Sequence, residues 1–216
     1  MPPPARLRLW PTTDELARMA RHPAAYAPTA AEVLTPPPMP LPAVPMGQAE
    51  RALMAAIIAD PDADGPRLRY AEWVEPTDPD RAAFIREQLA TPGIHAVGAG
   101  FEQFGARDVV YRRGFAEAMS LTGRSFVSLS DALFAATPLR EVRLIAVNFL
   151  LPELAACANL RRLTRLDLRG NRIGDAGAVV LAASPHVGEL KELDLTDNGV
   201  TEVGLHAFSG VVKVVA

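Results

Sequence analysis

Length, composition and charge exclude several classes of protein. The 216 residues are 49% apolar and 22% charged, which suffices for one large or two small globular domains, and the formal net charge of −3 provides no overall basic field for nucleic acid. The single cysteine, Cys157, excludes an intramolecular disulfide and a zinc site built from several thiolates, and no apolar run approaches the ~20 residues of a membrane span. We therefore expect a cytoplasmic chain that binds neither nucleic acid nor a membrane.

Residues 1–47 form a proline-rich leader or linker. The run from Thr35 to Pro45 has too few backbone N–H groups for a helix or a sheet, which predicts an extended polyproline II segment. Its Pro37 and Pro40 make a PxxP pattern, typical of a ligand for a proline-binding groove, although such tracts also serve as stiff linkers or surface straps. Two short helices with capping boxes are expected before it, beginning at Thr12 and Thr29.

From residue 48 the chain becomes helical. Three groups of apolar residues recur at helical spacing and predict three short helices that share one small core. We interpret Tyr70 and Trp73 as the aromatic part of that core. The glycines between residues 91 and 113 meet no phosphate-binding motif, so a loop is expected there. The expected core positions are Leu53, Met54, Ile57 and Ile58, then Leu68, Ala71 and Val74, then Phe84, Ile85 and Leu89.

The acidic stretch Asp60–Gly65 has two interpretations. Its oxygen-bearing residues and its glycine match the first half of an EF-hand calcium loop. The twelfth position of that loop, however, is Ala71 instead of glutamate, and Pro66 occupies the seventh. The pattern therefore favours a turn between two helices, in which Asp64 caps a helix that opens at Pro66.

The last hundred residues contain an internal repeat. The stretch Leu163–Ile173 recurs 27 residues later as Leu190–Val200, and both copies fit the pattern LxxLxLxxNxL. Alternating leucines would fill the interior, while the residues between them face a concave surface. We expect Asn171 and Asn198 to hydrogen-bond backbone groups in the turns, and we expect convex helices over 175–183 and 202–209.

Two earlier copies of the repeat are degraded, so about four units span residues 114–216. The apolar tail 211–216 either closes the array or pairs with a partner. The degraded copies consist of Leu139, Val142, Leu144 and Phe149, and of Ala116, Met119 and Leu121 followed by a helix with Leu129, Leu133 and Phe134.

Three stretches together resemble a known bacterial family, the repeat-companion domain found beside leucine-rich repeats: Glu50–Trp73, Asp80–Gln88 and Arg112–Phe115. The repeats are similar to the ribonuclease-inhibitor-like class. The resemblance implies an α/β fold, with a small three-helix companion module and connector over 48–113. A short solenoid with a parallel concave sheet and convex helices would follow over 114–216. The family implies no established catalytic residues and is associated with protein interaction; Glu72 stands where it usually has aspartate, and the leader is a departure.

The sequence provides no catalytic constellation. Its four histidines are widely separated, and neither HExxH nor GxSxG occurs. Cys157 has the surroundings of a small buried hydrophobe, and His206 is interpreted as a surface or packing residue of a convex helix. We therefore predict a protein that is not an enzyme and has no cofactor and no metal.

The predicted concave face carries three columns of side chains. The columns are Ala118, Glu141, Arg165 and Glu192; then Ser120, Arg143, Asp167 and Asp194; then Thr122, Ile145, Arg169 and Thr196. Charges alternate between neighbouring strands except at Asp167 and Asp194. That like-charge pair requires a cation from Arg165, Arg169 or Lys191, or from a partner. The candidate partner-binding residues are Glu141, Arg143, Arg165, Asp167, Arg169, Lys191, Glu192 and Asp194.

These observations favour a non-catalytic interaction protein, an adaptor or recognition subunit that binds another protein through the concave face. The alternative is a substrate or inhibitor of an enzyme partner, such as a protease, in a bacterial stress or defence assembly. In that case the proline-rich leader would engage the partner. The oligomeric state does not follow from the sequence.

Overall fold

The described chain begins with three helices and continues into a seven-stranded sheet. A computed structural model describes residues 47–91, 93, 95–98, 100–209 and 213–216. The leader before Gly47, with its PxxP pattern and its two expected helices, lies outside the described residues. The elements are α3 (Gln48–Ala59), α4 (Asp64–Val74), α5 (Pro79–Ala90), β1 (His95–Gly98), η1 (Glu102–Phe104), β2 (Arg107–Arg112), β3 (Phe115–Thr122), α6 (Gly123–Ala136), β4 (Glu141–Ile145), α7 (Leu151–Ala155), η2 (Ala158–Arg162), β5 (Arg165–Asp167), α8 (Gly174–Ala182), β6 (Glu192–Asp194), α9 (Glu202–His206) and β7 (Lys213–Val215).

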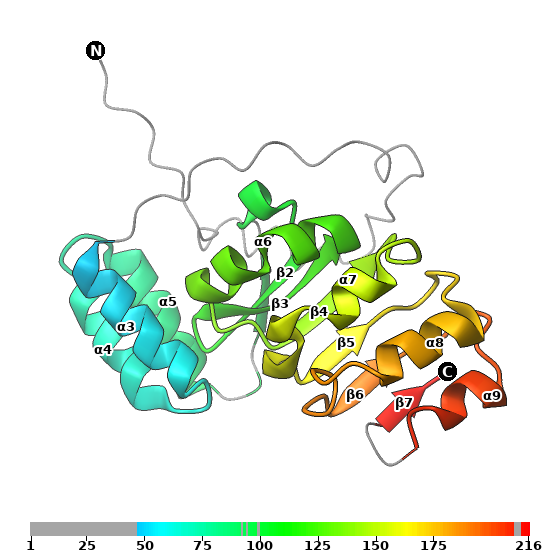
Figure 1. The fold of residues 1–216 in the computed structure, drawn as a ribbon. Coiled ribbons are helices and arrows are strands. Elements are labelled where there is room, and N and C mark those ends of the chain that lie inside the picture. Colours follow the sequence, from blue (N-terminus) through cyan, green and yellow to red (C-terminus); the bar gives the residue numbers. More distant parts are fainter. Residues whose placement is uncertain (1–46, 92, 94, 99, 210–212) are drawn as a thin grey trace.

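The strands follow one another across the sheet in chain order, from β1 to β7. The pairs β1–β2 and β2–β3 are antiparallel, and every pair from β3 to β7 is parallel. Helices α6 to α9 lie along one side of the parallel strands, which is the expected result of strand–helix units stacked side by side (Figure 1). We call the opposite side of strands β3 to β6 the open face.

The main core lies between the sheet and helices α6 to α9. The repeat leucines provide it as predicted: Leu166 and Leu193 pair in register on β5 and β6 and are fully buried. On β3 and β4, Met119 and Leu121 pair with Val142 and Leu144, which confirms the degraded copies at these positions. Phe149 is an exception, because it is 88% exposed; Val147, the residue at the asparagine position of this copy, is buried there instead.

Asn171 and Asn198 stabilise the turns that follow β5 and β6, as predicted. Asn171 Nδ2 donates to the carbonyls of Leu144 and Leu168 at 2.8 Å each, and its Oδ1 accepts from Val147 N at 3.1 Å. Asn198 repeats this arrangement one strand later, with its Oδ1 accepting from Asn171 N at 2.8 Å. The two amides therefore join consecutive turns through buried hydrogen bonds. The described end of the apolar tail forms β7, which pairs parallel to β6 and extends the sheet.

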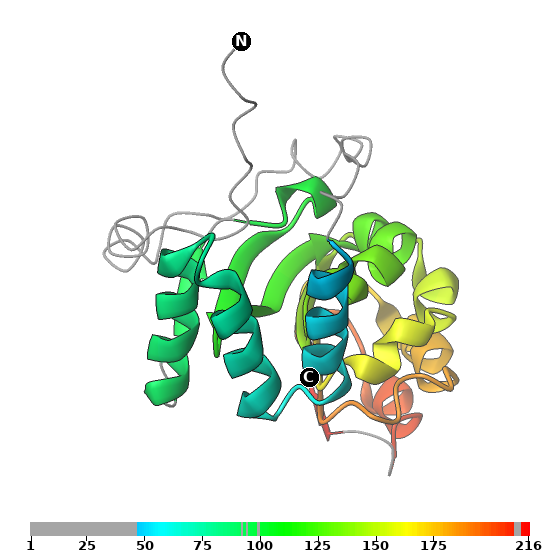
Figure 2. The same ribbon diagram turned by 90° about the vertical axis from the view of Figure 1, so that its left-hand side faces the viewer.

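Helices α3, α4 and α5 stand side by side at the β1 end of the molecule (Figure 2). Their cluster includes Met54, Ile57, Tyr70 and Ile85 and is completed by Phe115 from the first residue of β3. The helices were predicted, but two of the expected core residues were wrong. Leu68 and Trp73 are exposed, at 41% and 40%, because α4 turns the face carrying Arg67, Tyr70, Ala71 and Val74 toward its neighbours.

The predicted cap of α4 was also wrong. The helix begins at Asp64, two residues before Pro66, and its N-cap residue is Ala63. Asp64 lies in the first turn, where its negative charge faces the positive end of the helix dipole.

The expected loop between residues 91 and 113 instead contains two strands. Residues 95–98 and 107–112 form β1 and β2, and β2 is joined to β3 by a tight turn at Arg113 and Gly114. Both turn residues have positive φ, 49° and 83°, as a two-residue hairpin turn of type I′ requires. A Cβ at Gly114 would lie 2.9 Å from Ile85 Cα, so only glycine fits between the hairpin and α5.

Candidate functional site

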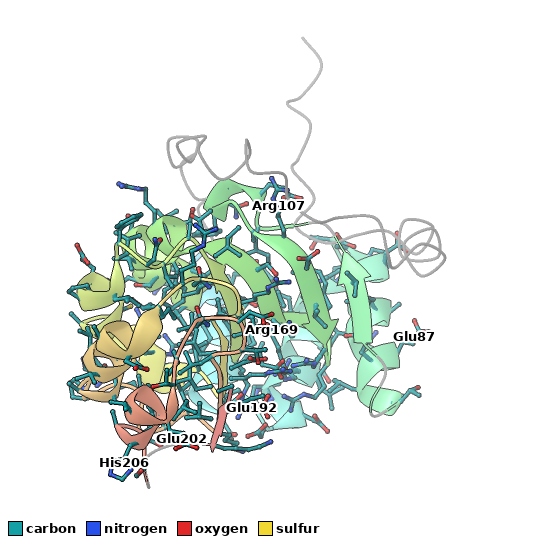
Figure 3. All side chains as sticks on the ribbon, turned by 90° about the vertical axis from the view of Figure 1, so that its right-hand side faces the viewer. Glu87, Arg107, Arg169, Glu192, Glu202 and His206 are labelled. Carbon is teal, nitrogen blue, oxygen red and sulfur yellow. The ribbon has the colours of Figure 1, made fainter. Side chains whose placement is uncertain are left out.

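The open face carries the first two predicted columns of side chains in the predicted register. Glu141 pairs with Arg165 and then Glu192, and Arg143 pairs with Asp167 and then Asp194. Strand alternation places these residues opposite the buried Val142, Leu144, Leu166 and Leu193. Figure 3 shows Arg169 and Glu192 on the sheet, apart from Glu202 and His206 of α9.

The first column is a chain of ion pairs. Arg112 of β2 reaches over β3 to Glu141, with a distance of 2.6 Å between Nη1 and Oε1. Arg165 and Lys213 flank Glu192 from the two neighbouring strands, at 3.1 and 3.2 Å. The carboxylates of this column are therefore neutralised by residues of the same sheet.

An internal arginine balances the like-charge pair Asp167 and Asp194. The guanidinium of Arg169 donates to both oxygens of Asp167, at 2.8 to 3.1 Å, and its Nε lies 3.4 Å from Asp194 Oδ2. Thr196 Oγ1 donates to Asp194 at 2.6 Å. The sequence left open whether the cation comes from this chain or from a partner. Among the described residues, Arg169 supplies it.

Asp167 is a titratable element of this face. Burial raises the pKa of its carboxyl, but hydrogen bonds from the side chain and backbone of Arg169, with the charges of Arg169 and Arg143, lower the pKa further, to below its ordinary value. A carboxyl with a depressed pKa in the folded state contributes stability above its unfolded pKa of about 3.9 and loses it as pH falls through the folded value.

We therefore expect Asp167→Asn to destabilise the protein by up to about 1 kcal/mol at pH 6, and by less at pH 2.5, where the carboxyl of wild type takes up a proton. Urea unfolding of both proteins at the two pH values measures it. Glu87→Gln is the control for the loss of one negative charge, because Glu87 is an exposed residue of α5 that lies far from Arg169 (Figure 3). A difference between wild type and Asp167→Asn that stays constant with pH contradicts the assignment.

A hollow of about 360 Å³ opens on this face. Its lining includes Ala118 and Ser120 of β3, Val110 of β2, and Arg143 and Arg165 of β4 and β5. The hollow forms above β3 because that strand presents small side chains, whereas the strands on one side of it present long arginines. Its lining also includes Glu141, Asp167 and Arg169, so five of the eight candidate residues border the hollow. Glu192 and Asp194 pair with two of these five, Arg165 and Arg169.

Lys191 lies elsewhere. With Asp62, Arg113, Glu117 and Arg140 it lines a second hollow of about 220 Å³, between the α3–α4 turn and the parallel strands. In this turn the carboxylate of Asp62 accepts a hydrogen bond from Arg140 Nη1 at 2.6 Å, and its backbone carbonyl accepts from Arg113 Nη1 at 3.1 Å. The acidic turn therefore contacts the sheet through arginines.

A buried ion pair lies beneath this contact and was not predicted from the sequence. Val110 and Tyr111 pair with Ala118 and Ala116, which leaves Glu117 as the extra residue of a β-bulge. Its carboxylate accepts from Arg67 Nη2 at 2.7 Å, and the same nitrogen donates to Pro61 O at 2.8 Å. Burial lowers the pKa of Arg67 to about 10 although Glu117 raises it, so the guanidinium is charged at neutral pH.

Two other residues considered from the sequence are Cys157 and His206. Cys157 is half-buried, with its Sγ 3.5 Å from Ser130 Oγ, and packs against the main core. His206 is an exposed residue at the end of α9.

Within the described ranges no three His, Cys, Asp or Glu residues are grouped to hold a metal ion, and none of the helices there is long and apolar enough to cross a bilayer.

Comparison with known proteins supports the repeats directly. A family model described as "Leucine Rich repeat" matches residues 159–182 and 190–209, the segments that contain β5 with α8 and β6 with α9. The chain therefore contains leucine-rich repeats within a mixed α/β fold. Neither the curated proteins nor the solved structures yielded a match. Leucine-rich repeats generally mediate protein–protein interaction and are typically non-catalytic.

Proposed function

We propose that this protein is an adaptor or recognition subunit that binds another protein through the open face of its sheet. In this proposal residues 48–113 form a companion module and connector, and residues 114–216 form a short repeat array that presents the face. The binding residues are Glu141, Arg143, Arg165, Asp167, Arg169, Glu192 and Asp194, together with Lys191 in the second hollow, which Glu141 also borders.

The hollow beside the repeat strands is the observation that supports this function most directly. It lies on the side of β3 to β6 that helices α6 to α9 leave uncovered, and charged side chains with many hydrogen-bonding atoms surround it. Parallel strands hold these side chains in a fixed register, so the face is largely formed before a partner binds, which reduces the entropy lost on binding.

Photo-crosslinking tests the proposed function. A benzophenone amino acid replaces Ile145, which follows Arg143 on the open face of β4, in the full chain expressed in its native cells. The matched control carries it at Val179, an exposed residue of α8 on the helix-covered side. We expect protein adducts at Ile145 and few at Val179. Adducts of equal yield at the two positions, or adducts at Val179 alone, contradict the proposal.

A further inference from the structure

The charges of the open face are layered by depth. The side chains of Arg143, Arg165 and Arg169 are 45–49% exposed, whereas those of Asp167 and Asp194 are 11% and 8% exposed. The positive and negative charges of these columns nearly cancel in number. The carboxylates of Asp167 and Asp194 lie close to the sheet, those of Glu141 and Glu192 are 28% and 27% exposed, and the three guanidinium groups are more exposed than all four carboxylates. We call these three guanidinium groups the cationic outer layer; the exposed carboxylate of Asp108 also borders the hollow, at the side of β2.

Arg143 has the largest unused hydrogen-bonding capacity in this layer. Among the described residues its ion-pair partner is Asp167, at 4.0 Å between Nε and Oδ2, and Asp167 already accepts closer bonds from Arg169. A guanidinium carries five N–H donors in a planar fork that matches a carboxylate. Arg165 is engaged through its Nε by Glu192 at 3.1 Å, and its outer edge also borders the hollow.

The spacing of these two arginines fits an extended peptide. Arg143 and Arg165 lie diagonally on neighbouring strands, since Arg143 is in register with Asp167 and Arg165 with Glu141. Strands ~4.8 Å apart with a rise of ~3.3 Å per residue place their Cα atoms about 8 Å apart. Acidic residues at alternate positions of an extended segment are separated by ~6.6 Å, which long arginine side chains readily span.

We propose, on the basis of the proposed function, that the hollow binds an extended acidic segment of the partner protein. Carboxylates of the segment pair with the outer guanidinium edges of Arg143 and Arg165, and its backbone crosses the small residues Ala118 and Ser120 of β3. A protein segment is favoured over nucleic acid because the cationic layer is local, whereas the chain carries a net charge of −3 that repels a polyanion at longer range.

The test uses the full chain and a labelled alternating Glu-Gly peptide of ~10 residues, whose carboxylates lie on one side when it is extended. Fluorescence anisotropy measures its binding at low and at physiological ionic strength. The controls are an alternating Gln-Gly peptide and single-stranded oligothymidylate. Arg143→Gln removes one outer guanidinium from the open face, and Arg124→Gln makes the same charge change at an exposed position of α6 on the helix-covered side.

We expect the Glu-Gly peptide to bind, the Gln-Gly peptide not to bind, and added salt to weaken binding. Arg143→Gln should weaken it about tenfold, since charge-assisted hydrogen bonds are lost, and Arg124→Gln should leave it unchanged. Thermal unfolding checks that both variants fold, which is expected because the Arg143 side chain is half exposed.

Absent binding of the Glu-Gly peptide, equal binding by the two variants, or tighter binding of oligothymidylate overturns the inference. The crosslinking experiment at Ile145 then shows whether only the acidic-segment inference is wrong or the proposed function is wrong as well. If protein adducts still form there, the open face binds a partner of different chemistry and only the acidic-segment inference falls. If they do not form, both fall.

Discussion

Replacing Glu117 with alanine should destabilise the protein by about 3–5 kcal/mol, because it leaves a charged guanidinium buried without its carboxylate. Arg67 is 0% exposed, and Glu117 Oε1 is its anionic partner, 2.7 Å from Nη2. The same oxygen accepts from Arg113 Nη2 at 2.9 Å, so the change also weakens the contact between the α3–α4 turn and the sheet. Chemical denaturation measures the change in free energy of unfolding.

The matched control is Glu75→Ala. Glu75 and Arg86 form an ion pair of similar length, 2.6 Å, on the surface of the helices. Because water solvates both groups, we expect little or no change in stability there. The double variant Arg67→Met, Glu117→Met removes both buried charges. Its loss of stability should be smaller than the sum of the losses in the single variants Arg67→Met and Glu117→Met. Equal effects of Glu117→Ala and Glu75→Ala would show that the buried pair does not hold the junction.

Asn171→Leu should destabilise the protein by about 2–4 kcal/mol, because it removes a buried amide that bonds several backbone groups. The carbonyls of Leu144 and Leu168 and the N–H of Val147 each lose a partner. Leucine has a similar size, so the expected cost comes from unsatisfied polar groups and not from a cavity. Urea unfolding of the variant measures it.

Asn159→Leu is the control for this prediction. Asn159 also donates a short hydrogen bond, 2.7 Å to Asp131 Oδ1, but at an exposed site where water replaces the lost partner. The expected cost is below about 1 kcal/mol. Asn198→Leu should behave as Asn171→Leu does, since the two asparagines make equivalent bonds. A cost at Asn171 no larger than that at Asn159 would contradict the role of the amide in the turn.

The repeats could be predicted from the sequence because two independent signals coincide in them. The period of 27 residues aligned Leu166 with Leu193, and strand alternation then assigned Arg165 and Asp167 to the opposite face. Register follows from such a pattern because a slip by one residue would expose every leucine. The degraded copy failed only at Phe149, which lies beyond the altered turn, where Val147 occupies the asparagine position of the repeat.

The hairpin of β2 and β3 was missed because the region before β3 lacks clear alternation of apolar and polar residues, although one signal was present. The run Arg107–Arg112 contains β-branched and aromatic residues and is followed by Arg113 and Gly114. A glycine in a two-residue connection between such runs is typical of a hairpin turn. Gly98, Gly100 and Gly105 instead suggested a comparison with phosphate-binding motifs, and a loop was predicted when none fitted.

The buried pair of Arg67 and Glu117 was missed for a different reason. Periodicity treats arginine as a surface residue, so Leu68 was taken for the core position of α4. The structure buries Arg67 because four acceptors surround it, and these come from segments 45 to 50 residues away as well as from Pro61. Such a long-range arrangement leaves no local pattern in the sequence.

The sequence predicted which residues form the columns of the candidate site, but not how exposed each charged side chain is. Register placed Arg143 beside Asp167 and Asp167 beside Asp194, and the structure agrees. Which of these charges is exposed depends on side-chain length and on the position of Arg169 over both carboxylates. The sequence therefore suggested a cationic partner group at the aspartates, whereas the layered face is better suited to an acidic partner.

Crosslinking from Ile145, compared with Val179, is the most direct test of the account, because it reports contact on one face of the sheet in the intact protein. It should be repeated in the double variant Arg143→Gln, Arg165→Gln. We predict protein adducts at Ile145 that map to an acidic segment and decrease strongly in the double variant, with few adducts at Val179. Adducts of equal yield from the two faces would contradict the claim that the open face is the binding surface.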